Sequence, residues 1–251
     1  MIIKTHLTKL IVATFCLALA FFSCKKDETK EETSTTATPY SCATCVTAPE
    51  ALAQHDNTSK GIYKGVLIGS TGTVKFDIQN GSNDITATMV IDGDTILLTS
   101  SVTVEEGQTL IAPFTGTWNG EAVSLVFQVD ADGNNSTILT ANIPGHSGIV
   151  VTVVKETSTD LVEAFEGTYN RSASETGTFN IVLSRSMGLW GGIAREDGEL
   201  DHSEIDGTIT ANGTIKNEDG VNIGQLNGET LSGSFQDSEQ FTVTFSGQRT
   251  L

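Results

Sequence analysis

The chain has 251 residues, of which 31 are acidic and 14 are lysine or arginine, so its formal net charge is −17. An acidic surface repels phosphate backbones, which excludes DNA and RNA as expected partners. Aromatic residues make up 6% of the chain, and it has 25 glycines but only 4 prolines. This composition is typical of a β-rich protein with many turns and excludes a helical bundle.

Residues 1–23 have the three-part pattern of an export signal. Lys4 and Lys9 give it a positive start, and residues 10–22 form an uncharged apolar run that a serine separates from Cys24. The run is shorter than the roughly 20 residues that a membrane-spanning helix needs. We therefore expect this segment to be cleaved.

The sequence Phe21-Phe22-Ser23-Cys24 resembles the lipobox of bacterial lipoproteins. The resemblance implies cleavage by signal peptidase II and attachment of acyl chains such as palmitate to Cys24, which would be the membrane anchor. The following residues, 25–28, resemble the surface-export signal of lipoproteins in one group of Gram-negative bacteria; a solvated charged run is the alternative. We expect a lipid-anchored protein of the outer membrane in the cell envelope, and leave open whether it faces the surface.

The distribution of glycine indicates a domain boundary near residue 60, because all 25 glycines lie at or after Gly61. Residues 25–39 are charged and rich in Thr and Ser, which predicts a flexible tether. The sequence Thr47-Ala-Pro-Glu50 has capping-box spacing with proline in the first turn, which predicts a short helix at 48–55. Residues 24–60 thus form a linker before the globular part.

Cys42 and Cys45 lie within this linker. Once the leader is removed and Cys24 is lipidated, they are the two remaining thiols of the chain. An oxidising compartment favours a disulfide between them. A redox-active pair and a metal site are the alternatives, but the sequence lacks a strand before the motif and a second pair of close ligands.

From Gly61 onward, apolar and polar residues alternate with a period of two. Val74, Phe76 and Ile78 are one example, and the alternation places apolar side chains on one face of a sheet. Asn-Gly and Asp-Gly pairs recur between such runs and are typical of two-residue hairpins. The chain is therefore predicted to be all-β, as hairpin-connected antiparallel meanders.

The globular part also contains an internal repeat. Gly61-Ile-Tyr63 and Gly167-Thr-Tyr169 open its two halves; further markers recur in the same order, namely Thr-Gly-Thr at 71 and 176, Asp-Gly at 92 and 197, and Asn-Gly-Glu at 119 and 227. We expect two β units, at residues 61–155 and 165–251, each with seven or eight strands. Two small barrels or sandwiches are favoured over a single structure that shares one sheet.

The second unit resembles a known bacterial module. Its Gly-Thr-Tyr opening, its Thr-Gly-Thr-Phe strand and its ending Phe245-Ser-Gly-Gln-Arg249 are similar to a common Gly/Thr-rich β module of exported proteins without assigned chemistry. The resemblance implies an antiparallel barrel or sandwich. It implies no catalytic residues and no cofactor.

Motifs that suggest chemistry are incomplete. The hydrolase-like segment 144–148 is followed by Ile149, where the elbow motif needs glycine. The calcium-like segment 130–134 is followed by Asn135 and Ala141, where the loop needs glycine and glutamate. The acidic run at 196–206 is typical of a solvated turn. The remaining histidines share no ligand spacing: His55, His146 and His202. We expect neither a metal site nor an enzyme.

Aromatic residues are the more informative candidates. Trp118 and Trp190 could face a ligand, whereas Tyr63 and Tyr169 share a repeat position and are expected to pack in the core. The leading hypothesis is a non-enzymatic interaction or structural module that contacts the membrane through its lipid. The alternatives are a lipocalin-like carrier of a small apolar ligand and a glycan-binding module; another envelope protein is a further potential partner.

Overall fold

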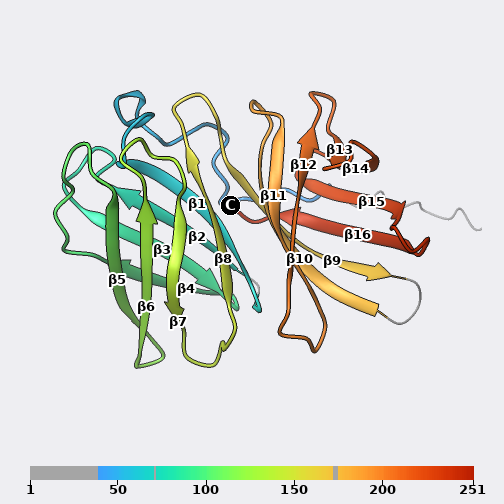
Figure 1. The fold of residues 1–251 in the computed structure, drawn as a ribbon, viewed down its shortest axis with the longest axis horizontal. Helices are drawn as coiled ribbons and strands as arrows, with labels where there is room; N and C mark the ends of the chain where they lie inside the picture. The colour runs from blue at the N-terminus through green and yellow to red at the C-terminus, as the bar shows by residue number, and fades with distance from the viewer. Residues whose placement is uncertain (1–38, 71, 172–174) are drawn as a thin grey trace, which may run out of the picture. The chain divides into compact units, whose positions relative to one another are not determined.

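The computed structural model describes residues 39–70, 72–171 and 175–251 and is shown in Figure 1. These residues form sixteen β-strands and one 3-10 turn, η1 (Ala53–His55), so the all-β prediction is confirmed. The predicted signal at residues 1–23, the lipid site Cys24 and most of the tether lie outside the described residues. Within the described ranges, no helix has the length and hydropathy to cross a membrane.

The first eight strands form one antiparallel sheet, called barrel 1 below. Neighbouring strands follow the order β7-β6-β5-β4-β3-β2-β1-β8. The strands are β1 (Gly61–Ile68), β2 (Gly72–Ile78), β3 (Ile85–Ile91), β4 (Asp94–Thr99), β5 (Leu110–Trp118), β6 (Glu121–Val129), β7 (Thr137–Asn142) and β8 (Val150–Glu156). The two outermost strands, β7 and β8, do not pair with each other. Across this seam the Ser136 hydroxyl donates to the Val153 carbonyl (2.9 Å).

The second eight strands form a closed antiparallel barrel, called barrel 2, in the order β10-β11-β12-β13-β14-β15-β16-β9. They are β9 (Glu163–Arg171), β10 (Glu175–Ser184), β11 (Leu189–Glu196), β12 (Ser203–Ile209), β13 (Thr214–Asn217), β14 (Asn222–Asn227), β15 (Thr230–Gln236) and β16 (Thr242–Arg249). The expected tandem pair of antiparallel units is confirmed, and the two units do not share a sheet (Figure 1).

Both barrels follow the same meander order, but barrel 1 is open between β7 and β8 and barrel 2 is closed. Each is a meander in which the last strand returns to pair with the first, β8 with β1 and β16 with β9. The Asp92-Gly93 and Asp197-Gly198 turns join the third and fourth strands of their barrels, as the repeat predicts. Asn119-Gly120 joins the fifth and sixth strands, but Asn227-Gly228 joins the sixth and seventh. This marker of the repeat is therefore one hairpin out of register, because Asn-Gly suits any tight hairpin.

The predicted helix at 48–55 is wrong, because only Ala53–His55 form a single 3-10 turn. Leu52 is extended (φ −86°, ψ 133°), and its amide donates to the side chain of Asn80 (2.9 Å). The Glu50 amide likewise donates to the carboxylate of Glu156 (2.6 Å). Contacts with barrel 1 thus hold the segment extended and override the local capping signal.

The two barrels have separate hydrophobic cores, and a third small cluster packs between them. Val66 of β1 meets Val162, Ala164 and Val182 there. All eight residues of β1 are buried, since one face of this strand lies in barrel 1 and the other against barrel 2. Beside the cluster, the side-chain amide of Asn180 donates to the Leu67 carbonyl.

Candidate functional site

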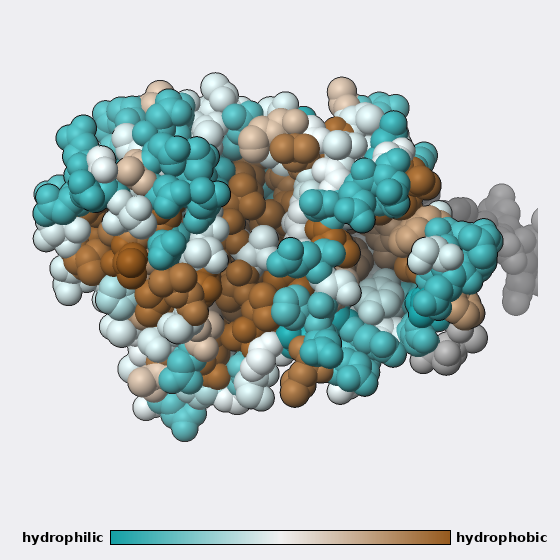
Figure 2. Space-filling view, viewed as in Figure 1, coloured by the Kyte–Doolittle hydropathy of each residue, from teal (hydrophilic) through white to brown (hydrophobic). Residues whose placement is uncertain are grey.

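Barrel 2 contains a cavity of about 340 Å³. This volume falls within the range of small-molecule sites, which begins at about 300 Å³. Its walls are mainly aliphatic and aromatic side chains, with Tyr169, Phe179, Trp190, Phe235 and Phe245 among them. Figure 2 shows hydrophobic residues (brown) between hydrophilic residues (teal) on the side of barrel 2.

The cavity exists because aromatic rings lie against glycines on the inner wall. Phe179 pairs with Gly167 across the ladder, and a Cβ added to Gly167 would lie 2.4 Å from the Phe179 ring. Phe245 pairs with Gly233, where an added Cβ would lie 2.5 Å from that ring. Each ring therefore occupies the space of a missing side chain beside the wall and leaves the centre of the barrel open.

The interior of barrel 1, in contrast, is filled by side chains. Tyr63, Phe76, Phe114 and Phe127 have no exposed surface and pack against one another. The ring centroids of Phe76 and Phe127 are 4.8 Å apart, and those of Tyr63 and Phe127 are 5.0 Å apart. Offset and edge-on packing at such distances is typical of a close-packed core. The two barrels therefore share a strand order but differ in their interiors.

The polar part of the cavity lining lies where β12 and β13 separate. These strands pair over only three residues, from Gly207 to Ile209 on β12. The first half of β12 has no partner on this side, and its Glu204 and Asp206 line the cavity together with Asn217 and Glu218. Glu204 and Asp206 flank the inward-facing Ile205 and lie opposite Ile193 and Gly191 on the outer face of β11, so alternation directs their carboxylates away from the cavity interior.

Tyr169 differs from its counterpart in barrel 1. The Tyr63 hydroxyl is buried, donates to the Ser59 carbonyl (2.9 Å) and accepts from Lys155 Nζ (3.1 Å). Tyr169 is half-buried, lines the cavity, and its hydroxyl has no hydrogen-bond partner among the described residues. Burial raises its pKa, and the negative charges of Glu196 and Asp197 raise it further. The expectation of a shared core role therefore holds for Tyr63 but not for Tyr169.

The two tryptophans lie in different settings. Trp190 lines the cavity, is 7% exposed, and its indole NH donates to the Lys216 carbonyl (2.9 Å). Trp118 lies at the end of β5 in barrel 1, where its indole NH donates to Asp94 (2.8 Å) and its ring lies 5.3 Å from that of His146. Of the two predicted ligand-facing aromatics, Trp190 is the one that contacts the cavity.

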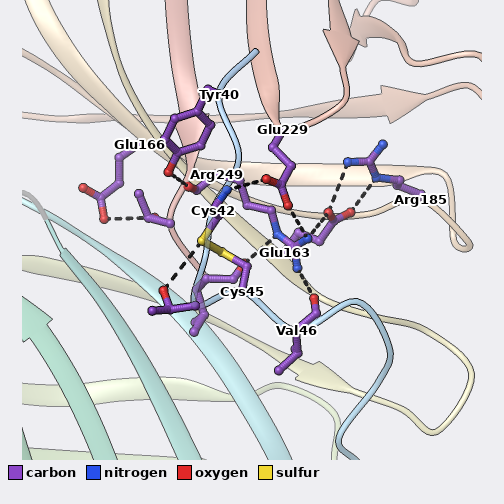
Figure 3. Close-up of a disulfide and its surroundings, with 12 residues drawn as sticks. Tyr40, Cys42, Cys45, Val46, Glu163, Glu166, Arg185, Glu229 and Arg249 are labelled. Atoms are coloured by element: carbon purple, nitrogen blue, oxygen red, sulfur yellow. Dashed lines mark hydrogen bonds and ion pairs between the residues drawn. A yellow bond between two sulfur atoms is a disulfide. The ribbon is translucent and has the colours of Figure 1, made fainter. Parts of the chain in front are cut away.

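Cys42 and Cys45 form the predicted disulfide (Figure 3). The loop that it closes packs on barrel 2, where the Cys42 amide donates to the Glu229 carboxylate (2.5 Å). The Tyr40 hydroxyl donates to the Arg249 carbonyl (2.6 Å), and the Arg249 guanidinium donates to the Val46 carbonyl (2.6 Å). The disulfide therefore has a structural setting, in a segment that is fixed to the barrel.

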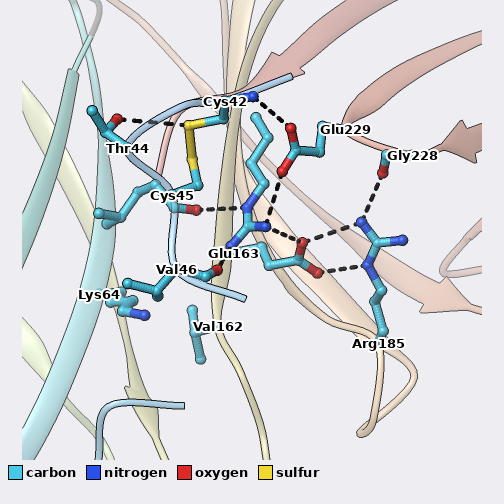
Figure 4. Close-up of polar contacts among 12 residues, drawn as sticks. Cys42, Thr44, Cys45, Val46, Lys64, Val162, Glu163, Arg185, Gly228 and Glu229 are labelled. Carbon is cyan, nitrogen blue, oxygen red and sulfur yellow. Dashed lines mark hydrogen bonds and ion pairs between the residues drawn. A yellow bond between two sulfur atoms is a disulfide. The ribbon is translucent and has the colours of Figure 1, made fainter. Parts of the chain in front are cut away.

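A charged network supports this loop (Figure 4). The Glu163 carboxylate, 3% exposed, lies 3.2 Å from Arg249 and 2.7 Å from Arg185. Arg185 also donates to the Gly228 carbonyl (2.8 Å). Arg249 and Arg185 are thus engaged at the end of barrel 2 that the loop covers, opposite the end where β12 and β13 separate.

The other motifs have ordinary surroundings. His146 of the 144–148 segment lies 3.3 Å from Asp92, and Asp132 of the 130–134 segment bonds to Asn134 within its own turn. In the part of the chain that the structure describes, no group of three or more His, Cys, Asp or Glu residues is arranged to hold a metal ion. The acidic run at 196–206 contributes Glu204 and Asp206 to the cavity border.

Comparison of the chain with protein-family models, with curated proteins and with solved structures finds no significant match. The function is therefore inferred from the geometry of the chain itself.

Proposed function

We propose that the protein binds a small apolar ligand inside barrel 2 and that barrel 1 is its structural support. One observation carries the proposal: of two tandem eight-stranded meanders, the closed second one has rings packed over wall glycines beside a cavity of about 340 Å³. The role is binding and not catalysis, because the walls are mainly hydrocarbon. The lipocalin-like alternative thus becomes the preferred function, and the interaction or structural role is assigned to barrel 1.

We also propose that the protein is an outer-membrane lipoprotein anchored through Cys24. The lipobox-like residues and the short apolar run before them support this. Mass spectrometry of the mature N-terminus should find a diacylglycerol-modified Cys24, and a Cys24→Ser variant should leave the membrane fraction. An unmodified terminus at another residue would contradict the anchor and leave the proposal for barrel 2 unaffected.

Ligand binding can be read from a single tryptophan. The chain has two tryptophans, so a Trp118→Phe variant retains only Trp190, in the cavity wall. Titration with decanol should shift the Trp190 emission to shorter wavelength and saturate. For a ligand of this size we expect a dissociation constant between about 1 and 100 µM.

The matched control is Trp190→Phe, which retains only Trp118 in barrel 1. The same titration should leave its emission unchanged, because Trp118 lies against His146 and Asp94 outside the cavity. Equal responses from both variants would indicate nonspecific adsorption, and no response from either would reject an apolar ligand in barrel 2.

A further inference from the structure

We infer that the seam between β7 and β8 of barrel 1 binds an extended segment of a partner protein, which pairs with both strand edges and closes the barrel. The inference concerns barrel 1 and does not depend on the ligand proposed for barrel 2. It follows from the unpaired edges of the two strands, from the groove between them and from their sequences (Figure 1).

The seam is the place where barrel 1 departs from barrel 2. In barrel 2 the corresponding strands, β15 and β16, pair over seven residues. In barrel 1, β7 pairs with β6 and β8 pairs with β1, but β7 and β8 do not pair with each other. A groove of about 390 Å³ is lined by residues 136–141 and 149–153, with Ile193 and Glu204 of barrel 2 beside it. Each of the two strands therefore has an unpaired edge along this groove.

The backbone groups of β8 that face the groove can be identified. The Thr152 carbonyl points toward β1, because a Cβ added to Gly65 of β1 would clash with its oxygen. Successive backbone groups of a strand point to opposite sides, so the NH and carbonyl of Val151 and Val153 face the seam. The Ser136 hydroxyl agrees with this direction, since it crosses the seam to donate to the Val153 carbonyl (2.9 Å). This hydroxyl occupies the place of the backbone donor that a further strand would supply.

The side chains at the seam favour an incoming strand that is apolar on one face. Leu139, on the outer face of β7, is 49% exposed. Four inward side chains pack against the core of barrel 1 but are only partly buried: Ile138, Ala141, Ile149 and Val151. A strand with a small aliphatic residue at every second position would cover these four side chains and complete the core at this point.

The two strands lack the features that usually protect an exposed edge. Lysine, proline or an inward-pointing charge normally keeps an edge strand from pairing with another chain. Residues 133–154 contain no Lys, Arg, Asp or Glu, although these residues make up 18% of the chain. The proline of this stretch, Pro144, lies in the loop between β7 and β8 and not in either strand. Both edges are therefore suited to pairing with a further strand.

A separate polypeptide fits the seam better than this chain does. Half of residues 25–38 are charged and their one apolar residue is Ala37, so this segment cannot supply an alternating apolar face. A second copy could pair its β7 with β7, but this symmetric contact would leave the edge of β8 uncovered. A separate extended segment can pair with both edges, and it must displace the Ser136 hydroxyl to do so.

The probe is a fluorescent peptide of alternating valine and threonine, with a lysine at each end for solubility. We expect saturable binding by anisotropy and slower hydrogen exchange at the Val151 and Val153 amides. The matched control peptide has the same sequence and is N-methylated at every second residue, so that one of its edges cannot donate. It should bind at least about tenfold more weakly.

Val151→Pro tests the seam from the side of the protein. The NH that proline removes faces the groove and not β1, so the ladder with β1 should persist. We expect this variant to lose peptide binding while its decanol binding in the Trp118→Phe background is unchanged, which also shows that it is folded. The matched control is Val151→Ala, which retains the NH and should retain binding.

The outcomes separate this inference from the ligand site of barrel 2. If the peptide does not bind, if its N-methylated form binds equally well, or if Val151→Pro retains binding, the inference is rejected. If the protein alone forms dimers by analytical ultracentrifugation and Val151→Pro abolishes them, a second copy covers the seam and a separate partner is rejected. Failure of decanol to bind would reject the proposed function and leave the seam unaffected.

Discussion

Replacing Ala194 with phenylalanine should abolish ligand binding in barrel 2 and leave the protein folded and stable. Ala194 lines the cavity and pairs with Phe179 across the ladder from β11 to β10. A phenyl ring at this position would extend into open space and occupy the volume that a decyl chain needs. It would bury additional apolar surface at a site that has room for it, so stability should change little or increase. Titration of the variant with decanol, in the Trp118→Phe background, should show no saturable shift of the Trp190 emission.

The matched control is Ala87→Phe in barrel 1. Ala87 is fully buried and pairs with Phe76, in the same relation that Ala194 has to Phe179. Because this core is filled, the added ring has no space and should destabilise the protein by at least about 1–3 kcal/mol while ligand binding persists. Denaturant unfolding of both variants measures the difference. If Ala194→Phe still binds the probe, or if Ala87→Phe is tolerated equally well, the contrast between a hollow and a filled barrel is incorrect.

The difference between the barrels could not be read from the sequence, because it depends on register. Apolar alternation predicts which residues point inward, and this was sufficient for the all-β fold and for two tandem units. It does not predict which residue lies opposite which. Phe179 leaves space in barrel 2 because the register of β9 against β10 places Gly167 across from it, and alternation alone does not fix that register. The same limit explains why Tyr63 and Tyr169, equivalent in the repeat, differ in burial.

Local signals failed where contacts from distant strands replaced them. The capping-box spacing at residues 47–50 predicts a helix, but the Glu50 amide bonds to Glu156, more than a hundred residues away in sequence. Glycine-rich turns were reliable because their requirement is local: Asn119 and Gly120 adopt positive φ (52° and 84°) at the hairpin that they predict. The position of an Asn-Gly pair within the repeat was not a reliable guide, because any two-residue hairpin accepts an Asn-Gly pair.

Glu156 should be among the most costly residues to remove, because it joins three parts of the structure at a fully buried point. Its carboxylate lies 2.6 Å from Lys64 Nζ, and neither side chain has exposed surface. It also accepts from the amides of Glu50 (2.6 Å) and Val162 (3.1 Å), so it fixes the segment before barrel 1 and the link to barrel 2. Among the described residues, Glu156→Ala would leave the buried lysine paired with Glu50 alone, at 3.3 Å, and would remove the acceptor of two amides. We expect a loss of about 3–5 kcal/mol in unfolding free energy.

A charge-free pair tests whether the cost comes from the unpaired lysine. In a Lys64→Met, Glu156→Gln variant the buried charge is absent and the glutamine oxygen still accepts one amide, so this double variant should be more stable than Glu156→Ala. The control is Glu239→Ala, which breaks an ion pair with Arg171 at a carboxylate that is 66% exposed and should cost less than about 1 kcal/mol. Denaturant midpoints of the three variants give the order. Should Glu156→Ala cost no more than Glu239→Ala, the buried pair does not hold the two barrels and the N-terminal segment together, and their contact must rest on Val66 and its neighbours.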